Sequence, residues 1–120
     1  MQPQNQLTGS PHRLVDQRHQ PRFKIEAAIT VSSRTCGRLR GHTVDISESG
    51  ISAILKIEVP VGELVELEFT LPFGPVITYA MVRQRNAFRY GFQFVESADV
   101  HKTIRETCRH LEVEQGLGKF

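Results

Sequence analysis

An alternation of apolar and polar residues, which begins at Phe23, constrains the fold of this chain more than any other feature. Phe, Ile, Ala, Ile and Val occupy every second position from Phe23 to Val31, and mostly polar residues lie between them. Because successive side chains of a β-strand point to opposite faces, a period of two is typical of a strand with one buried face. The pattern returns at residues 65–71 and 88–94. The sequence therefore predicts a protein built mainly of half-buried strands.

Clusters of turn-forming residues divide the apolar segments from one another. Residues 35–37, 47–50 and 72–75 contain the glycine, proline and serine residues that favour turns. In the last strand, four aromatic residues share one face and are expected to supply much of the core: Phe88, Tyr90, Phe92 and Phe94. The expected strands cover residues 23–32, 38–46, 51–56, 65–71, 76–85 and 88–94.

The periodicity changes after Phe94 and becomes helical. Ser97 is a suitable N-cap, and Asp99 follows in the first turn, where a carboxylate stabilises a helix. Apolar residues then recur at spacings of three and four, at Val100, Ile104, Cys108 and Leu111. Six antiparallel strands followed by one amphipathic helix predict a mainly β fold, a six-stranded antiparallel β-barrel whose open end is covered by a C-terminal α-helix.

The length of 120 residues suits one domain with a single core. We expect residues 1–17 to form a flexible leader, residues 18–114 the folded domain and residues 115–120 a short tail. Regular structure is expected to begin at Phe23, because the segment before it shows no sustained periodicity and contains three prolines.

Targeting and cofactor signals are lacking in the sequence. No stretch approaches the roughly 18 apolar residues of a membrane helix, and the first residues lack the basic and apolar order of a signal peptide. We therefore expect a cytoplasmic protein without a membrane segment. Cys36 and Cys108 are expected to be free thiols. The five histidines are scattered, and no nucleophile has an evident base, so we expect no catalysis, no metal and no cofactor.

Positive charge is concentrated near the start of the chain. Between His12 and His42 the sequence has seven Lys or Arg residues and two acidic ones, whereas from Thr43 onward it has eight Lys or Arg residues and eleven acidic ones. Such an asymmetry would raise the local concentration of an anionic ligand. The alternative is that these basic residues only solubilise a strand edge.

Arg18 and Arg22 form the first motif that carries chemistry. In an extended chain, residues four apart point to the same side, so both guanidinium groups can reach one ligand. An arginine fork matches the O6 and N7 acceptors of guanine bidentately and can stack on its face. Taken alone, the pair is better explained as a solvated basic linker.

The second motif is formed by Asp45, Ser47 and Gly50. Since Val44 and Ile46 are expected to face inward, Asp45 and Ser47 should share the outer face of the barrel wall. A carboxylate and a hydroxyl there could hold the donor edge of a purine. Gly50 would allow a tight turn with positive φ and leave room for a ligand. The competing interpretation is an Asx or Ser turn that caps a hairpin and binds nothing.

Together, the two motifs resemble those of the PilZ domain family. Arg-x-x-x-Arg is followed by Asp-x-Ser-x-x-Gly across a predicted strand pair, and the pattern of residues 89–94 agrees with the last strand of the family. The resemblance extends from Arg18 to Leu111. It implies a small β-barrel closed by a helix, and cyclic di-GMP as the ligand.

The resemblance also implies roles for individual residues. Arg18 and Arg22 would contact guanine and phosphate groups, and Asp45, Ser47 and Gly50 would complete the cyclic di-GMP site. The residue before the first arginine influences whether one cyclic di-GMP or a stacked pair is bound, and Gln17, which is not basic, leaves this stoichiometry open. Arg83 and Arg85, at the end of the fifth strand, either flank the site or are simply solvated.

The function implied is that of a non-enzymatic cyclic di-GMP receptor. Folding of the arginine segment over the ligand would change the protein surface and signal to a protein partner in motility, pilus, exopolysaccharide or biofilm control.

Two other functions compete with this one. Residues 89–95 are weakly similar to the aromatic strand of RNA-recognition domains, which would suit a small β-barrel that binds single-stranded nucleic acid. The glycine of that motif is misplaced, and the aromatic residues are better explained as core, so we expect no nucleic-acid partner. The third alternative is a PilZ-type protein-interaction module without a ligand, against which the intact motifs argue.

Overall fold

The computed structural model describes residues 13–15 and 20–116 of the chain. In this part of the chain, seven β-strands are followed by one long helix. The strands are β1 (Phe23–Lys24), β2 (Ala28–Ser33), β3 (Gly37–Ile46), β4 (Gly50–Ile54), β5 (Leu64–Leu71), β6 (Gly74–Asn86) and β7 (Arg89–Phe94), and the helix is α2 (Ala98–Glu114).

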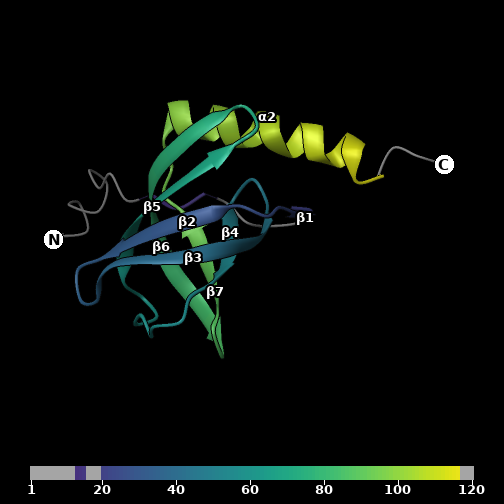
Figure 1. The fold of residues 1–120 in the computed structure, drawn as a ribbon. Coiled ribbons are helices and arrows are strands. Elements are labelled where there is room, and N and C mark those ends of the chain that lie inside the picture. The colour runs from purple at the N-terminus through teal and green to yellow at the C-terminus, as the bar shows by residue number, and fades with distance from the viewer. Residues whose placement is uncertain (1–12, 16–19, 117–120) are drawn as a thin grey trace, which may run out of the picture.

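Six of these strands form a closed antiparallel barrel. The order is β3-β2-β5-β6-β7-β4, and pairing of β3 with β4 closes the circle. The short strand β1 is an addition that pairs with the end of β3. Helix α2 crosses one end of the barrel, beside the raised hairpin of β5 and β6 (Figure 1). The predicted six-stranded antiparallel barrel with a C-terminal helix is confirmed.

The core is filled from the inner faces of the strands. Ile29, Val31 and Leu67 are almost completely buried, and the rings of Phe69 and Phe94 stack with their centroids 6.4 Å apart. Aromatic residues Tyr90, Phe92 and Phe94 of β7 are also buried, as predicted.

Phe88 was expected to share this face, and that prediction is wrong. Its side chain is 54% exposed. Residues Asn86 and Arg89 pair to close the hairpin between β6 and β7, and Ala87 takes a left-handed conformation with φ of 57°. Phe88 therefore belongs to the turn and not to the strand, so the alternation of the strand does not govern where it points.

The first predicted strand is divided into β1 and β2 by the side chain of Thr43. The Thr43 hydroxyl accepts a hydrogen bond from the backbone N–H of Ala27 at 2.9 Å and donates one to the carbonyl of Ile25 at 2.8 Å. Backbone hydrogen bonds to β3 continue beside this side chain, from Ile25 to Val44 at 3.2 Å and from Thr43 to Ala27 at 2.9 Å, so the pairing between β1 and β2 is irregular but not broken.

Residues 13–15, which the sequence analysis places in the leader, are joined to the barrel. Leu14 forms an isolated bridge with Val95, and the backbone N–H of Val15 donates to the carbonyl of Phe94 at 3.0 Å. Val15 is only 6% exposed and belongs to the core. Contacts with the barrel therefore begin before Phe23, contrary to the expectation that ordered structure starts at that residue.

Helix α2 begins after Ser97, as predicted, and packs against the barrel through a stripe that includes Ile104, Cys108 and Leu111. At the other end of the helix, the side chain of Gln115 binds the backbone of Lys24. Its carbonyl accepts from the Lys24 N–H at 2.9 Å, and its amide donates to the Lys24 carbonyl at 2.7 Å. The end of the helix is thus tied to β1. Within the described residues, no helix combines the length and the apolar character needed to cross a bilayer.

Candidate functional site

A β-bulge in β3 turns the side chain of Asp45 toward the outside of the barrel. Thr43 pairs with Ala53 and Asp45 with Ser52, so the register shifts by one residue between them. Thr43 is buried, and uninterrupted alternation would place Asp45 on the same inner face. The extra residue reverses the alternation, so that Ile46 fills the core and Asp45 lies on the outer wall.

The Asp45 carboxylate is held by three side chains from three different segments. Its Oδ1 atom accepts hydrogen bonds from Nε of Arg22 at 2.8 Å and from the hydroxyl of Ser52 at 2.7 Å, and it forms an ion pair with Nη2 of Arg22 at 2.7 Å. Its Oδ2 atom accepts from Nη2 of Arg89 at 2.8 Å. These contacts fix the orientation of the carboxylate.

The same contacts keep Asp45 ionised. Burial alone would raise the pKa of Asp45, but the hydrogen bonds from Ser52 and Arg22 and the positive charges of Arg22 and Arg89 outweigh burial and lower the pKa below its ordinary value. Asp45 is therefore a permanently charged acceptor at neutral pH.

Ser47 does not share the outer face with Asp45, contrary to the sequence prediction. Its side chain is fully buried in the turn between β3 and β4. The hydroxyl oxygen accepts from the backbone N–H groups of Ser49 and Gly50, each at 3.2 Å. Nη1 of Arg22 also reaches this oxygen, at 3.5 Å. Ser47 thus shapes the turn, as the interpretation of this motif as a Ser turn expects. Its hydroxyl also contacts the guanidinium group of Arg22.

Gly50 is required for close packing of two strands. A Cβ atom at this position would lie 2.3 Å from the backbone carbonyl oxygen of Phe92 in the neighbouring strand β7. The expected positive φ is not found at Gly50. The absence of a side chain therefore serves the close approach of β4 to β7.

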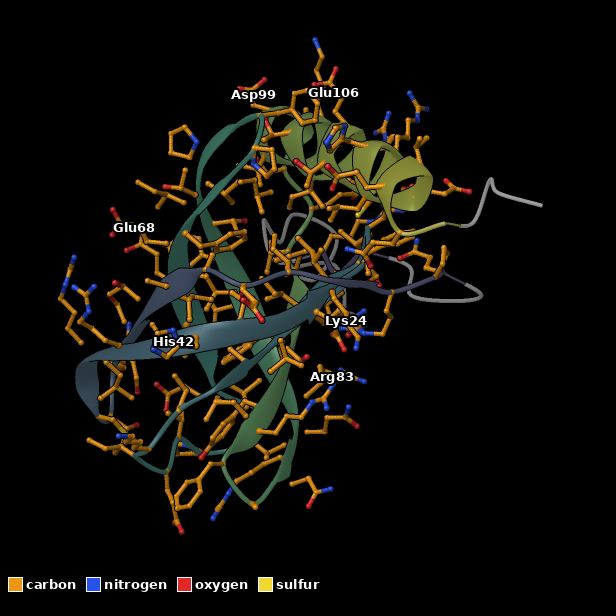
Figure 2. The ribbon with its side chains drawn as sticks, turned by 45° about the vertical axis from the view of Figure 1, so that its right-hand side comes forward. Lys24, His42, Glu68, Arg83, Asp99 and Glu106 are labelled. Carbon is orange, nitrogen blue, oxygen red and sulfur yellow. The ribbon has the colours of Figure 1, made fainter. Side chains whose placement is uncertain are left out.

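A hollow of about 640 Å³ opens on the outer wall around Asp45. Its lining includes Arg22, Asp45, Gly50, Arg83 and Arg85 of the predicted site. Figure 2 shows Arg83 projecting from one side of the barrel and Glu68 from the opposite side. Gln17 and Arg18 lie outside the described residues.

The two arginines of β6 are placed by a second bulge and by local contacts. The register between β6 and β7 shifts between Val82 and Gln84, which leaves Arg83 as the extra residue. Arg85 pairs with Glu58 at 2.8 Å and donates from Nε to the carbonyl of Ala87 at 3.0 Å. Both arginines belong to the lining of the hollow, on its β6 side.

The sequence analysis did not single out three functional residues of the hollow. Two of them are Ser52 and Arg89, the partners of Asp45 described above. The third is Gln93, whose side-chain amide donates to the carbonyl of Val15 at 2.7 Å, while its Oε1 atom is buried and has no hydrogen-bond partner among the described residues. A strand alternation indicates that Arg89 points outward, but only the pairing of β4 with β7 places it beside Asp45.

The lining of the hollow is electropositive. Among the described residues it contains four arginines, at positions 22, 83, 85 and 89, and one carboxylate, Asp45. No group of three or more His, Cys, Asp or Glu side chains within the described ranges is arranged to hold a metal ion. The arrangement suits an anionic ligand that also presents hydrogen-bond donors to a carboxylate.

Comparison with known proteins identifies the fold. The profile of the PilZ domain matches residues 16–110. Solved structures with the same fold include the PilZ domain of YcgR from Escherichia coli with c-di-GMP, which is 18% identical with a TM-score of 0.66, over 83% of this chain and 95% of that domain. Comparison with curated protein sequences gave no match.

Two longer proteins also share the fold. The complex of MrkH from K. pneumonia with c-di-GMP is 17% identical with a TM-score of 0.69, over 84% of this chain and 54% of MrkH. The Bacillus subtilis inhibitor of motility MotI/DgrA is 17% identical with a TM-score of 0.69, over 85% of this chain and 54% of that protein. The chain thus spans about half the length of these two proteins, and by the match over residues 16–110 it belongs to the PilZ domain family.

Proposed function

We propose that this protein is a receptor for cyclic di-GMP, which binds in the hollow around Asp45. The observation that carries the proposal is a carboxylate that is fixed and ionised on the outer wall of the barrel and is surrounded by arginines. The solved PilZ domain of YcgR and the MrkH complex contain this ligand.

The chemistry of the hollow matches both parts of such a ligand. Guanine presents N–H donors on one edge, which a carboxylate accepts, and the O6 and N7 acceptors on another edge, which an arginine fork recognises. The two phosphates carry negative charge, which the arginines of β6 and the N-terminal segment can neutralise. Arg22, and by the family motif Arg18, would contact guanine and phosphate.

Binding would be communicated to the rest of the protein through the segment that carries Arg22. This residue directly precedes β1, and β1 is tied to the end of α2 by the two hydrogen bonds between Lys24 and Gln115. A movement of Arg22 toward the ligand would therefore change the position of β1 and of the helix end. The altered surface would signal to a protein partner in motility, pilus, exopolysaccharide or biofilm control.

The buried aromatic residues of β7 argue against the nucleic-acid alternative. Binding of single strands by stacking needs exposed rings. Tyr90, Phe92 and Phe94 are between 1% and 3% exposed, so they cannot stack on bases without opening the core.

Isothermal titration tests the proposal. The wild-type protein should bind cyclic di-GMP and should bind GTP and a short single-stranded RNA far more weakly. Asp45→Asn should lose most of the affinity. Glu68→Gln is the matched control, because Glu68 is also ion-paired with an arginine, Arg38 at 3.4 Å, but lies on the opposite side of the barrel (Figure 2). Absence of cyclic di-GMP binding by the wild type, or a preference for RNA, would refute the proposal.

A further inference from the structure

The two carboxylate oxygens of Asp45 accept different numbers of hydrogen bonds. Oδ1 accepts two hydrogen bonds, from Nε of Arg22 and from the hydroxyl of Ser52, and forms an ion pair with Nη2 of Arg22, whereas Oδ2 accepts one hydrogen bond, from Arg89. A carboxylate offers about four lone-pair directions, two on each oxygen. Oδ1 is thus fully occupied, and Oδ2 retains one direction for a further donor.

A guanine edge needs one acceptor direction on each oxygen, since its two N–H donors lie side by side. The occupancy of Oδ1 prevents this until one of its donors leaves. Arg22 supplies one of the two hydrogen bonds and the ion-pair contact, and its departure would free one direction on Oδ1 for the ligand. Arg89 approaches the other oxygen and leaves room there, so its bond is compatible with a bound guanine.

The two arginines also differ in how firmly the backbone holds them. Arg22 directly precedes β1, which has only two residues. Arg89 lies in β7 and is paired on one side with Ile54 of β4 and on the other with Asn86 of β6. Arg22 can therefore move with its segment, whereas Arg89 is anchored in the barrel wall.

From these observations we infer that Arg89 is a positioning residue, which keeps the Asp45 carboxylate oriented toward guanine after Arg22 has moved from the carboxylate to the ligand. This inference rests on the proposed function. It assigns different roles to two arginines that bind the same side chain in the free protein. Arg22 gives up its contact with Asp45 to the ligand, whereas Arg89 keeps its bond to Asp45.

The test compares Arg89→Gln with Arg38→Gln in titrations with cyclic di-GMP. Both variants lose one arginine and one ion pair with a carboxylate, but Arg38 pairs with Glu68 and not with Asp45. Arg89→Gln should bind roughly tenfold more weakly than the wild type, and Arg38→Gln should bind as the wild type does. Arg89→Lys, which retains a cationic donor for Oδ2, should recover part of the loss.

A double-mutant cycle separates positioning from direct contact with the ligand. If Arg89 acts through Asp45, adding Arg89→Gln to Asp45→Asn should cause little further loss, measured by NMR titration so that weak binding is quantified. If the two losses multiply, or if Arg89→Gln binds like Arg38→Gln, the inference is wrong. Failure of the wild type to bind cyclic di-GMP would instead refute the proposed function.

Discussion

Ser52 and Asp45 face each other across strands β4 and β3, and the hydroxyl of Ser52 donates a 2.7 Å hydrogen bond to Oδ1 of Asp45. This bond stabilises the charged form of the carboxylate. Because the pKa of Asp45 in the folded protein is lower than the ordinary value of 3.8, its contribution to stability is present above that value. The contribution is lost as the pH falls through the lower value of the folded state.

The first prediction concerns the acid limit of ligand binding. Ser52→Ala removes a hydrogen bond that lowers the pKa of Asp45, so protonation should begin at higher pH and the affinity for cyclic di-GMP should fall earlier on acidification. Dissociation constants measured from about pH 7 down to about pH 2 would include the range below 3.8 in which the wild-type carboxyl titrates and would show the shift, and an NMR titration of the Asp45 carboxyl carbon would assign it. Ser32→Ala, on the outer face of β2, is the control and should leave the profile unchanged. Identical acid limits in all three proteins would contradict the role given to Ser52.

The strands could be located from the sequence because a strand with one buried face has an apolar residue at every second position. Phe92 and Phe94 could therefore be assigned to the core from the sequence alone, and the helical stripe ending at Leu111 could be assigned in the same way. The bulges could not be predicted, because an extra residue is defined only relative to a partner strand. The one between Thr43 and Asp45 decides which face carries the carboxylate.

The candidate site shows the same limit. Asp45 and Arg22 could be selected from their motif spacing, and the structure brings them together. Arg89 lies 44 residues from Asp45, and only the order of strands around the barrel makes them neighbours. Ser47 was assigned to the outer face by continuing the strand pattern into a turn, where backbone hydrogen bonds to the hydroxyl determine its position.

The second prediction separates binding from stability at Arg22. Its ion pair with Asp45 is partly exposed, so Arg22→Ala should change the free energy of unfolding by only about 0–1 kcal/mol. Asp45 keeps its bonds to Ser52 and Arg89 and is not left unpaired. Binding of cyclic di-GMP should weaken by roughly 1–3 kcal/mol, and Arg18→Ala should behave alike. Calorimetry and thermal melts measure the two effects, and unchanged affinity in both variants would remove these arginines from the site.

The third prediction contrasts two aromatic residues of the hairpin formed by β6 and β7. Phe92 is 3% exposed and Phe88 is 54% exposed. Phe92→Ala should therefore lower the free energy of unfolding by roughly 3–5 kcal/mol, whereas Phe88→Ala should change it by no more than about 0.5 kcal/mol. Urea denaturation of both variants gives the comparison. A stable, folded Phe92→Ala protein that had selectively lost binding to RNA would instead support the nucleic-acid alternative.

The fourth prediction concerns Gly50, whose role is to let β4 approach β7. The added Cβ of Gly50→Ala would meet the backbone carbonyl of Phe92, which cannot move aside without disturbing the ladder. We expect the variant to be less stable by roughly 1–3 kcal/mol and to bind cyclic di-GMP less well. Gly37→Ala is an instructive contrast. There the added Cβ meets no atom within 4 Å, so its cost comes only from the positive φ of 82°. Wild-type stability of Gly50→Ala would show that the strands can separate slightly.

The last prediction tests whether the arginine segment responds to the ligand. If Arg22 leaves Asp45 and closes over cyclic di-GMP, the backbone of residues 18–22 should exchange its amide hydrogens more slowly in the complex than in the free protein. The turn at residues 34–36, which joins β2 to β3 and does not line the hollow, should exchange equally in both states and serves as the internal control.

Gln115→Ala adds a second comparison, because it removes the two bonds that tie β1 to the helix end. The ligand should still protect residues 18–22 in this variant, but any ligand-induced change in exchange near the end of α2 should disappear. Equal exchange of residues 18–22 with and without cyclic di-GMP would mean that the arginines do not clamp the ligand. In that case the signal could not originate in this segment.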